Sequence, residues 1–158
     1  MTTSHAGALI DTPTARRLLI DLEPPLPRHW CDGDAFLSAF FNALSLSFPI
    51  GEQFFIDAVR NGAKALPPAQ AATMRAELQG FIGQEATHRH LHARFNRHLI
   101  TWGLVNRWEA RAAARLVQLQ GQDPRHALAI TAANSGAWPP GAAPGFTCSP
   151  QAACCAAA

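Results

Sequence analysis

Glu85 and His88 are the most informative pair of residues in the sequence, because they lie three residues apart inside a long helical pattern. At that spacing two side chains share one face of an α-helix, with their Cβ atoms about 5–6 Å apart. That face is otherwise apolar, apart from a further histidine; its other members are Leu78, Phe81, Ile82, His92, Phe95 and Leu99. A carboxylate on an apolar face is costly to bury unless it is paired or bound to a metal. The pair therefore indicates a metal-binding position.

A second carboxylate, Glu52, lies among phenylalanines on the helix predicted to precede this one. Glu-x-x-His together with a glutamate from a neighbouring helix makes half of the ligand set of ferritin-like di-metal carboxylate proteins. Carboxylate and imidazole donors suit iron or manganese, with zinc as a further candidate. We therefore predict Glu52, Glu85 and His88 as metal ligands. His92, one turn after His88, would be an additional ligand or a residue that orients one.

The same residues allow a different interpretation, in which this is a non-catalytic helical protein. Glu85 and His88 would then be a solvated pair of a kind common on helix surfaces. In that case an aromatic cluster would form a groove for a partner protein; its members would be Phe41, Phe48, Phe54 and Phe55.

Of the neighbouring histidines, His90 is rotated away from the apolar face and is expected to be exposed, and His98 is expected to be solvated.

Length and charge narrow the class of protein. A chain of 158 residues with 48% hydrophobic residues predicts one globular domain. The net charge of +2 is too small to indicate a nucleic-acid or anionic-membrane partner. No apolar run reaches the roughly 18–20 residues that a membrane span needs. Arg16 and Arg17 precede a short apolar stretch, but acidic residues and prolines follow too soon for a signal peptide. We expect a cytoplasmic protein acting on an unknown small molecule.

The periodicity predicts an all-α fold with a helical domain over residues 32–132. A proline-rich arm over 1–31 should lie across this domain, and residues 133–158 read as an irregular or disordered tail. The first helix should begin after an N-cap at Asp32 or Asp34 and end at Asn61-Gly62. Pro49 should kink or break it beside Glu52. Further helices are expected over 68–101, with Gly103 capping its end, over 106–120, and from Asp123-Pro124 onward.

Several blocks of this sequence resemble the bacterial family of predicted metal-dependent hydrolases over roughly residues 30–132. The blocks are Phe40-Phe41-Asn42-Ala43-Leu44-Ser45, Phe48-Pro49-x-Gly51-Glu52-x-Phe54-Phe55, Val59-Arg60, Phe81-Ile82-Gly83-Gln84-Glu85-Ala86-x-His88-x-x-x-His92 and Asn96. The resemblance implies a ferritin-like helical bundle in which Glu52, Glu85 and His88 are metal ligands, with His92 as a further one. It implies metal-dependent hydrolysis, although a ferritin-like site suits di-iron oxygen or redox chemistry equally well.

The sequence departs from the family pattern after about residue 132. Family members continue with further helices that complete the ligand set, whereas here the expected Glu-His gives way to Asn134-Ser135-Gly136 and a proline pair. We therefore expect an incomplete bundle, truncated or frameshifted at this point, which could be inactive alone. A two-fold homodimer would supply two copies of Glu52 and of the Glu85/His88 pair, which together equal the full four-Glu, two-His set.

Overall fold

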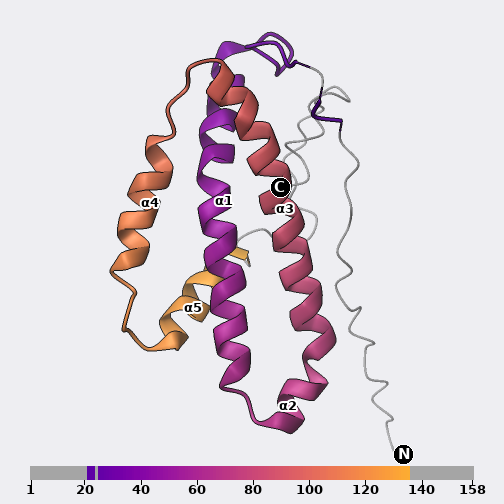
Figure 1. The fold of residues 1–158 in the computed structure, drawn as a ribbon, viewed down its shortest axis with the longest axis vertical. Helices are drawn as coiled ribbons and strands as arrows, with labels where there is room; N and C mark the ends of the chain where they lie inside the picture. The colour runs from indigo at the N-terminus through magenta and orange to yellow at the C-terminus, as the bar shows by residue number, and fades with distance from the viewer. Residues whose placement is uncertain (1–20, 24, 136–158) are drawn as a thin grey trace, which may run out of the picture.

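The computed structural model describes residues 21–23 and 25–135, and every regular element in these ranges is an α-helix (Figure 1). The helices are α1 (Ala35–Lys64), α2 (Pro68–Thr73), α3 (Arg75–Thr101), α4 (Arg107–Val117) and α5 (Pro124–Ser135). The predicted all-α class is therefore confirmed. Among these helices none has both the length and the apolar character needed to cross a bilayer. The predicted tail lies almost wholly outside the described residues, as does the first part of the predicted arm.

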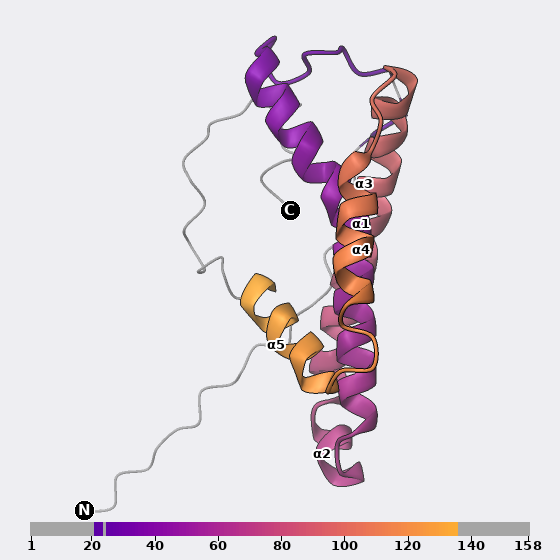
Figure 2. The same cartoon turned by 90° about the vertical axis from the view of Figure 1, so that its left-hand side faces the viewer.

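The helix α1 is the central element of this helical bundle, because it contacts α3, α4 and α5. Figure 1 shows α3 and α4 on opposite sides of α1, and Figure 2 shows α5 leading away from them. A short turn through α2 reverses the chain, so that α1 and α3 run antiparallel. This arrangement brings residues from the middle of α1 beside residues from the middle of α3.

Three predicted helix boundaries are confirmed by their capping contacts. The Asp34 carboxylate accepts a hydrogen bond from the Leu37 backbone N–H at 2.8 Å and starts α1. Gly103 follows α3 with φ +79°, and its N–H and that of Leu104 donate to the carbonyls of Ile100 and Leu99. This is a Schellman motif, which favours glycine because its closing residue is left-handed. Pro124 is the first residue of α5, as Asp123-Pro124 predicted.

Other boundaries differ from the prediction. Gly62 does not end the first helix, which continues to Lys64. Instead, a Cβ at Gly62 would lie 2.6 Å from Cδ1 of Leu128, so this glycine allows α5 to approach α1 closely. The helix predicted over 68–101 is two helices, because Met74 separates α2 from α3. The helix predicted over 106–120 ends earlier, at Val117, and continues as turns.

Pro49 lies inside α1 without breaking it. Proline removes one backbone hydrogen bond and pushes against the preceding turn, which bends a helix more readily than it ends one. Figure 2 shows that α1 changes direction along its length. The prediction of a break is therefore wrong, and the alternative of a bend agrees with the structure.

The buried core lies where the first residues described meet α1 and the end of α3. Its members are Leu22, Trp30, Cys31, Leu46, Phe95 and Leu99. The Trp30 indole N–H donates to the Asn42 side-chain oxygen at 2.9 Å, and the Ser38 hydroxyl accepts from the Cys31 backbone N–H. The segment before α1 is thus anchored by both apolar burial and hydrogen bonds.

His98 was expected to be solvated, and this prediction is wrong. Its side chain is partly buried, and Nε2 lies 2.6 Å from the Leu22 carbonyl oxygen. Because a carbonyl can only accept, Nε2 carries the proton and donates. The periodicity of the helix alone could not show this, since the partner comes from a segment more than seventy residues away.

Candidate metal centre

The structure brings Glu52 from α1 beside Glu85 and His88 from α3. One ligand atom from each of the three side chains lies within 4.8 Å of the others. The spacing of Glu85 and His88 puts both on the same face of α3, and the antiparallel pairing of the two helices puts Glu52 opposite them. Three of the four residues that the sequence predicted as ligands therefore form one cluster.

Glu52 is the most deeply buried member of the cluster, with 4% of its surface exposed. Its Oε2 atom has no hydrogen-bond partner in the part of the chain that the structure describes. Burial, together with the neighbouring Glu85 carboxylate, raises the pKa of Glu52 to about 8, although Arg89 acts in the opposite direction. A buried carboxyl with an unpaired oxygen is unusual, because an unpaired buried polar group is destabilising.

Glu85 and His88 are partly buried, and both favour the uncharged form. Burial raises the pKa of Glu85 and lowers the pKa of His88. A histidine with a lowered pKa is neutral at physiological pH, so a lone pair on its ring is available to a metal. Without a cation, burial therefore favours a protonated Glu85 carboxyl and a neutral His88 ring.

His92 is not one of the three clustered residues, but it contacts the cluster through Glu52. Its Nε2 lies 3.9 Å from Glu52 Oε1, and its ring packs against Phe48 with centroids 4.5 Å apart. Burial and the neighbouring His88 lower the pKa of His92 to about 4. His90, two residues earlier, is exposed, as the sequence predicted.

These donors fit a divalent cation. Two carboxylates and two neutral imidazoles are the ligand types that iron, manganese and zinc take in proteins. A cation among them would favour the ionised form of Glu52, which burial otherwise disfavours, and would give its unpaired oxygen a partner. The cluster therefore has donors suited to a cation, and a cation would stabilise the ionised form of Glu52.

Two further residues belong to the site, although the sequence assigned a role to neither. Ser45 on α1 has its hydroxyl oxygen 2.9 Å from Nδ1 of His92 and 2.8 Å from the side-chain oxygen of Asn96. The Asn96 amide nitrogen in turn donates to the Ser45 backbone carbonyl at 3.0 Å. The partners are separated by about fifty positions, so no local pattern could link them. The one local signal was Pro49, which has no N–H to bond the Ser45 carbonyl four residues earlier.

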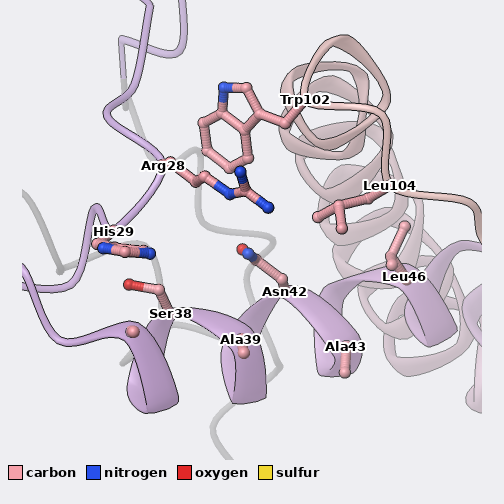
Figure 3. Close-up of a pocket in the computed structure, with 10 residues that line it drawn as sticks. Arg28, His29, Ser38, Ala39, Asn42, Ala43, Leu46, Trp102 and Leu104 are labelled. Carbon is pink, nitrogen blue, oxygen red and sulfur yellow. The ribbon is translucent and has the colours of Figure 1, made fainter.

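A separate pocket lies along the N-terminal half of α1, where the segment before α1 meets the end of α3. Figure 3 shows that side chains from these three elements point into the same space; among them are Arg28, Asn42 and Trp102. None of the clustered carboxylates or imidazoles lines this pocket. Its Asn42 side chain is already bonded to Trp30. The candidate metal centre and this pocket are therefore distinct regions.

Comparison with known proteins agrees with the chemistry of the cluster. A search of curated proteins found no match, and a search of solved structures found none. The model of one protein family, described as predicted metal-dependent hydrolase, matches residues 14–134. This match covers well over half of the chain and includes Glu52, Glu85, His88 and His92. The chain therefore belongs to the family of predicted metal-dependent hydrolases.

Proposed function

We propose that this protein binds a divalent metal through Glu52, Glu85 and His88 and serves a hydrolytic reaction at that site. The observation that carries the proposal is the unpaired oxygen of buried Glu52 within a three-residue cluster of metal-ligand types. Family membership supports hydrolysis as the reaction class. Iron or manganese suits the mixed carboxylate and imidazole donors best, with zinc as the third candidate.

Each residue of the cluster would have a definite task. Glu52 and Glu85 would supply negative charge to the cation, and neutral His88 would add a nitrogen donor. A metal held there would lower the pKa of a bound water and polarise a substrate bond. His92, beside Glu52, would add a fourth donor or accept a proton at Nε2. The same ligands could serve dioxygen chemistry in a ferritin-like bundle, but the family description favours hydrolysis.

The aromatic groove of the competing interpretation receives less support. Phe41 packs against Trp30, with ring centroids 6.2 Å apart, and Phe48 packs against His92. Neither ring is among the large exposed apolar side chains of the described residues. These two phenylalanines are engaged inside the molecule, which favours a site over a partner groove.

Elemental analysis by plasma mass spectrometry tests the proposal. The chain should carry iron, manganese or zinc at a fixed ratio after extensive dialysis. Glu52→Ala and His88→Ala should lose that metal while keeping their helical circular dichroism. His90→Ala and Glu77→Ala are matched controls, because both residues are exposed on α3, and both should keep the metal. Equal metal content in all five proteins, or none in a folded wild type, would contradict the proposal.

Sedimentation of the metal-loaded protein tests whether two chains complete the site. A homodimer would bring together the four-Glu, two-His set typical of dinuclear centres in helical bundles. If two chains share the site, the metal-loaded protein is a dimer that dissociates when a chelator removes the metal. A monomer with metal bound would exclude the shared site and leave the cluster of a single chain as the binding unit.

A further inference from the structure

The hydrogen bonds around His92 form a chain whose direction can be worked out atom by atom. It starts at Pro49, which has no N–H and therefore leaves the Ser45 carbonyl without its usual partner in α1. The side-chain nitrogen of Asn96 donates to that carbonyl at 3.0 Å. A carbonyl can only accept, so the Asn96 amide must present its nitrogen there and its oxygen to the Ser45 hydroxyl.

The Ser45 hydroxyl then has a defined role. Because the Asn96 oxygen can only accept, the hydroxyl gives its single proton to that oxygen, at 2.8 Å. Its own oxygen is left to accept from the ring nitrogen of His92 at 2.9 Å. His92 must therefore carry its proton on Nδ1. In the neutral ring the other nitrogen, Nε2, then holds the lone pair.

The free nitrogen lies on the cluster side of the ring, since Nε2 is 3.9 Å from Glu52 Oε1. Phe48 packs on the ring and restricts its rotation. Histidines that bind metals are commonly held in this way, with one ring nitrogen donating to a fixed acceptor and the other left for the metal. Here the fixed acceptor is a hydroxyl that is buried between the two long helices.

We infer that Ser45 and Asn96 are positioning residues that hold His92 as the Nδ1–H tautomer and turn its Nε2 lone pair toward Glu52. This inference rests on the proposed metal site for its purpose, but the tautomer itself is a property of the metal-free protein. Pro49 is part of the arrangement, because the carbonyl that it leaves open is the one that orients Asn96. Pro49 on α1 thereby helps to orient a histidine on α3.

Nitrogen-15 NMR of the metal-free protein at neutral pH tests the tautomer directly. We expect the wild-type His92 ring to show a protonated Nδ1 and an unprotonated Nε2. In Ser45→Ala the ring loses its acceptor. In Asn96→Leu the Ser45 hydroxyl becomes free to donate to Nδ1. Both variants should therefore shift His92 toward the Nε2–H form. Ser45→Thr keeps the hydroxyl and should keep the wild-type tautomer.

Metal affinity provides the second readout, with Mn²⁺ as the titrant in calorimetry. Ser45→Ala and Asn96→Leu should bind Mn²⁺ about 10- to 100-fold more weakly, which is the usual effect of removing a residue that orients a ligand. Ser47→Ala is the matched control, because the Ser47 hydroxyl donates to the Leu44 carbonyl of its own helix, and its affinity should not change. An Nε2–H ring in the wild type, or unchanged affinity in both variants, would overturn the inference. A wild type that binds no metal but shows the Nδ1–H ring would sink the proposed function and leave the tautomer assignment standing.

Discussion

The α1–α3 pair contains two buried regions that differ in whether their buried polar groups have hydrogen-bond partners. Around the apolar core, buried polar side chains are paired with partners in the described residues: Asn42 accepts from Trp30, and Ser38 bonds both Cys31 and Asp34. Two to three helical turns further along α1, buried Glu52 has an oxygen without a partner and a pKa raised to about 8. The same two helices build both regions, so helix packing alone does not explain the contrast.

The contrast indicates which region stabilises the fold and which is shaped for a ligand. Paired polar groups in a core add specificity at little net cost, whereas an unpaired buried carboxyl lowers the stability of the folded state. An unpaired buried carboxyl is most simply explained by a bound ligand that pairs with it. We therefore expect substitutions in the core to lower stability without changing metal binding, and substitutions in the cluster to weaken metal binding without such a loss of stability.

The largest expected effect is that of Leu99→Ala. Leu99 is fully buried, and truncating such a side chain costs about 2–5 kcal/mol in free energy of unfolding. Urea denaturation followed by circular dichroism measures it. Ile100→Ala is the matched control, because Ile100 is 64% exposed and should change stability by less than about 0.5 kcal/mol. Similar losses for both variants would mean that the end of α3 is not packed as described.

Removal of a paired polar group in the core should have the next largest effect. Asn42→Ala leaves the buried Trp30 indole N–H without its acceptor, and this should lower the free energy of unfolding by about 1–3 kcal/mol. The Mn²⁺ affinity of the variant, measured by calorimetry, should equal that of the wild type. A loss of metal binding without a loss of stability would reverse the roles assigned to the two regions.

The stability of the metal-free protein should fall as the pH rises from about 7 to 8. Because Glu52 has its pKa raised to about 8 in the folded state, the folded protein binds more protons than the unfolded chain across this interval, and so stability decreases. The slope should be roughly 1 kcal/mol per pH unit. The pKa of His92 is lowered to about 4 and that of His88 is also lowered, so both add a gain in stability with pH. This gain is nearly complete by about pH 7.5, because the histidines of the unfolded chain titrate around the model value of 6.5.

Urea denaturation in a chelating buffer at several pH values measures this slope. Glu52→Gln should remove most of it, and the remainder should come from Glu85, whose pKa burial also raises. Glu77→Gln changes an exposed carboxylate on the same helix as Glu85 and should keep the wild-type slope. A slope in Glu52→Gln equal to that of the wild type would show that Glu52 is ionised without a metal.

The smallest expected effect concerns two glycines of α1. A Cβ at Gly51 would meet no atom within 4 Å, so Gly51→Ala should stabilise the protein by about 0.5–1 kcal/mol through helix propensity. Gly62→Ala should gain less or destabilise, because Leu128 occupies the space of the new Cβ. Thermal unfolding compares the two variants. Equal gains would mean that α5 does not pack on α1 at Gly62.

The sequence predicted the parts of this fold that depend on local chemistry. The N-cap at Asp34, the left-handed Gly103 and the start of α5 at Pro124 each follow from the conformational preference of one residue. The meeting of Glu52 with Glu85 and His88 followed from the shared helix face of Glu85 and His88 and from the pattern that pairs Glu-x-x-His with a glutamate of a neighbouring helix. At these three boundaries the local rule and the structure agree.

The parts that the sequence missed depend on contacts between distant segments. Gly62 reads as a helix end, but it is the point where α5 packs on α1. His98 reads as solvated until the segment containing Leu22 covers it. The bonds that orient His92 join residues about fifty positions apart, and no periodicity encodes such a distance. Within the sequence, only Pro49, which lacks an N–H, indicated that the Ser45 carbonyl needs a partner outside its own helix.

Anomalous X-ray diffraction from crystals grown with Mn²⁺, measured on both sides of the manganese absorption edge, tests directly whether the cluster binds a metal. We predict an anomalous peak within bonding distance of Glu52, Glu85 and His88, with Nε2 of His92 facing it. A well-ordered structure with no peak at these residues, or with peaks only at exposed side chains such as Asp57 and His90, would contradict the account.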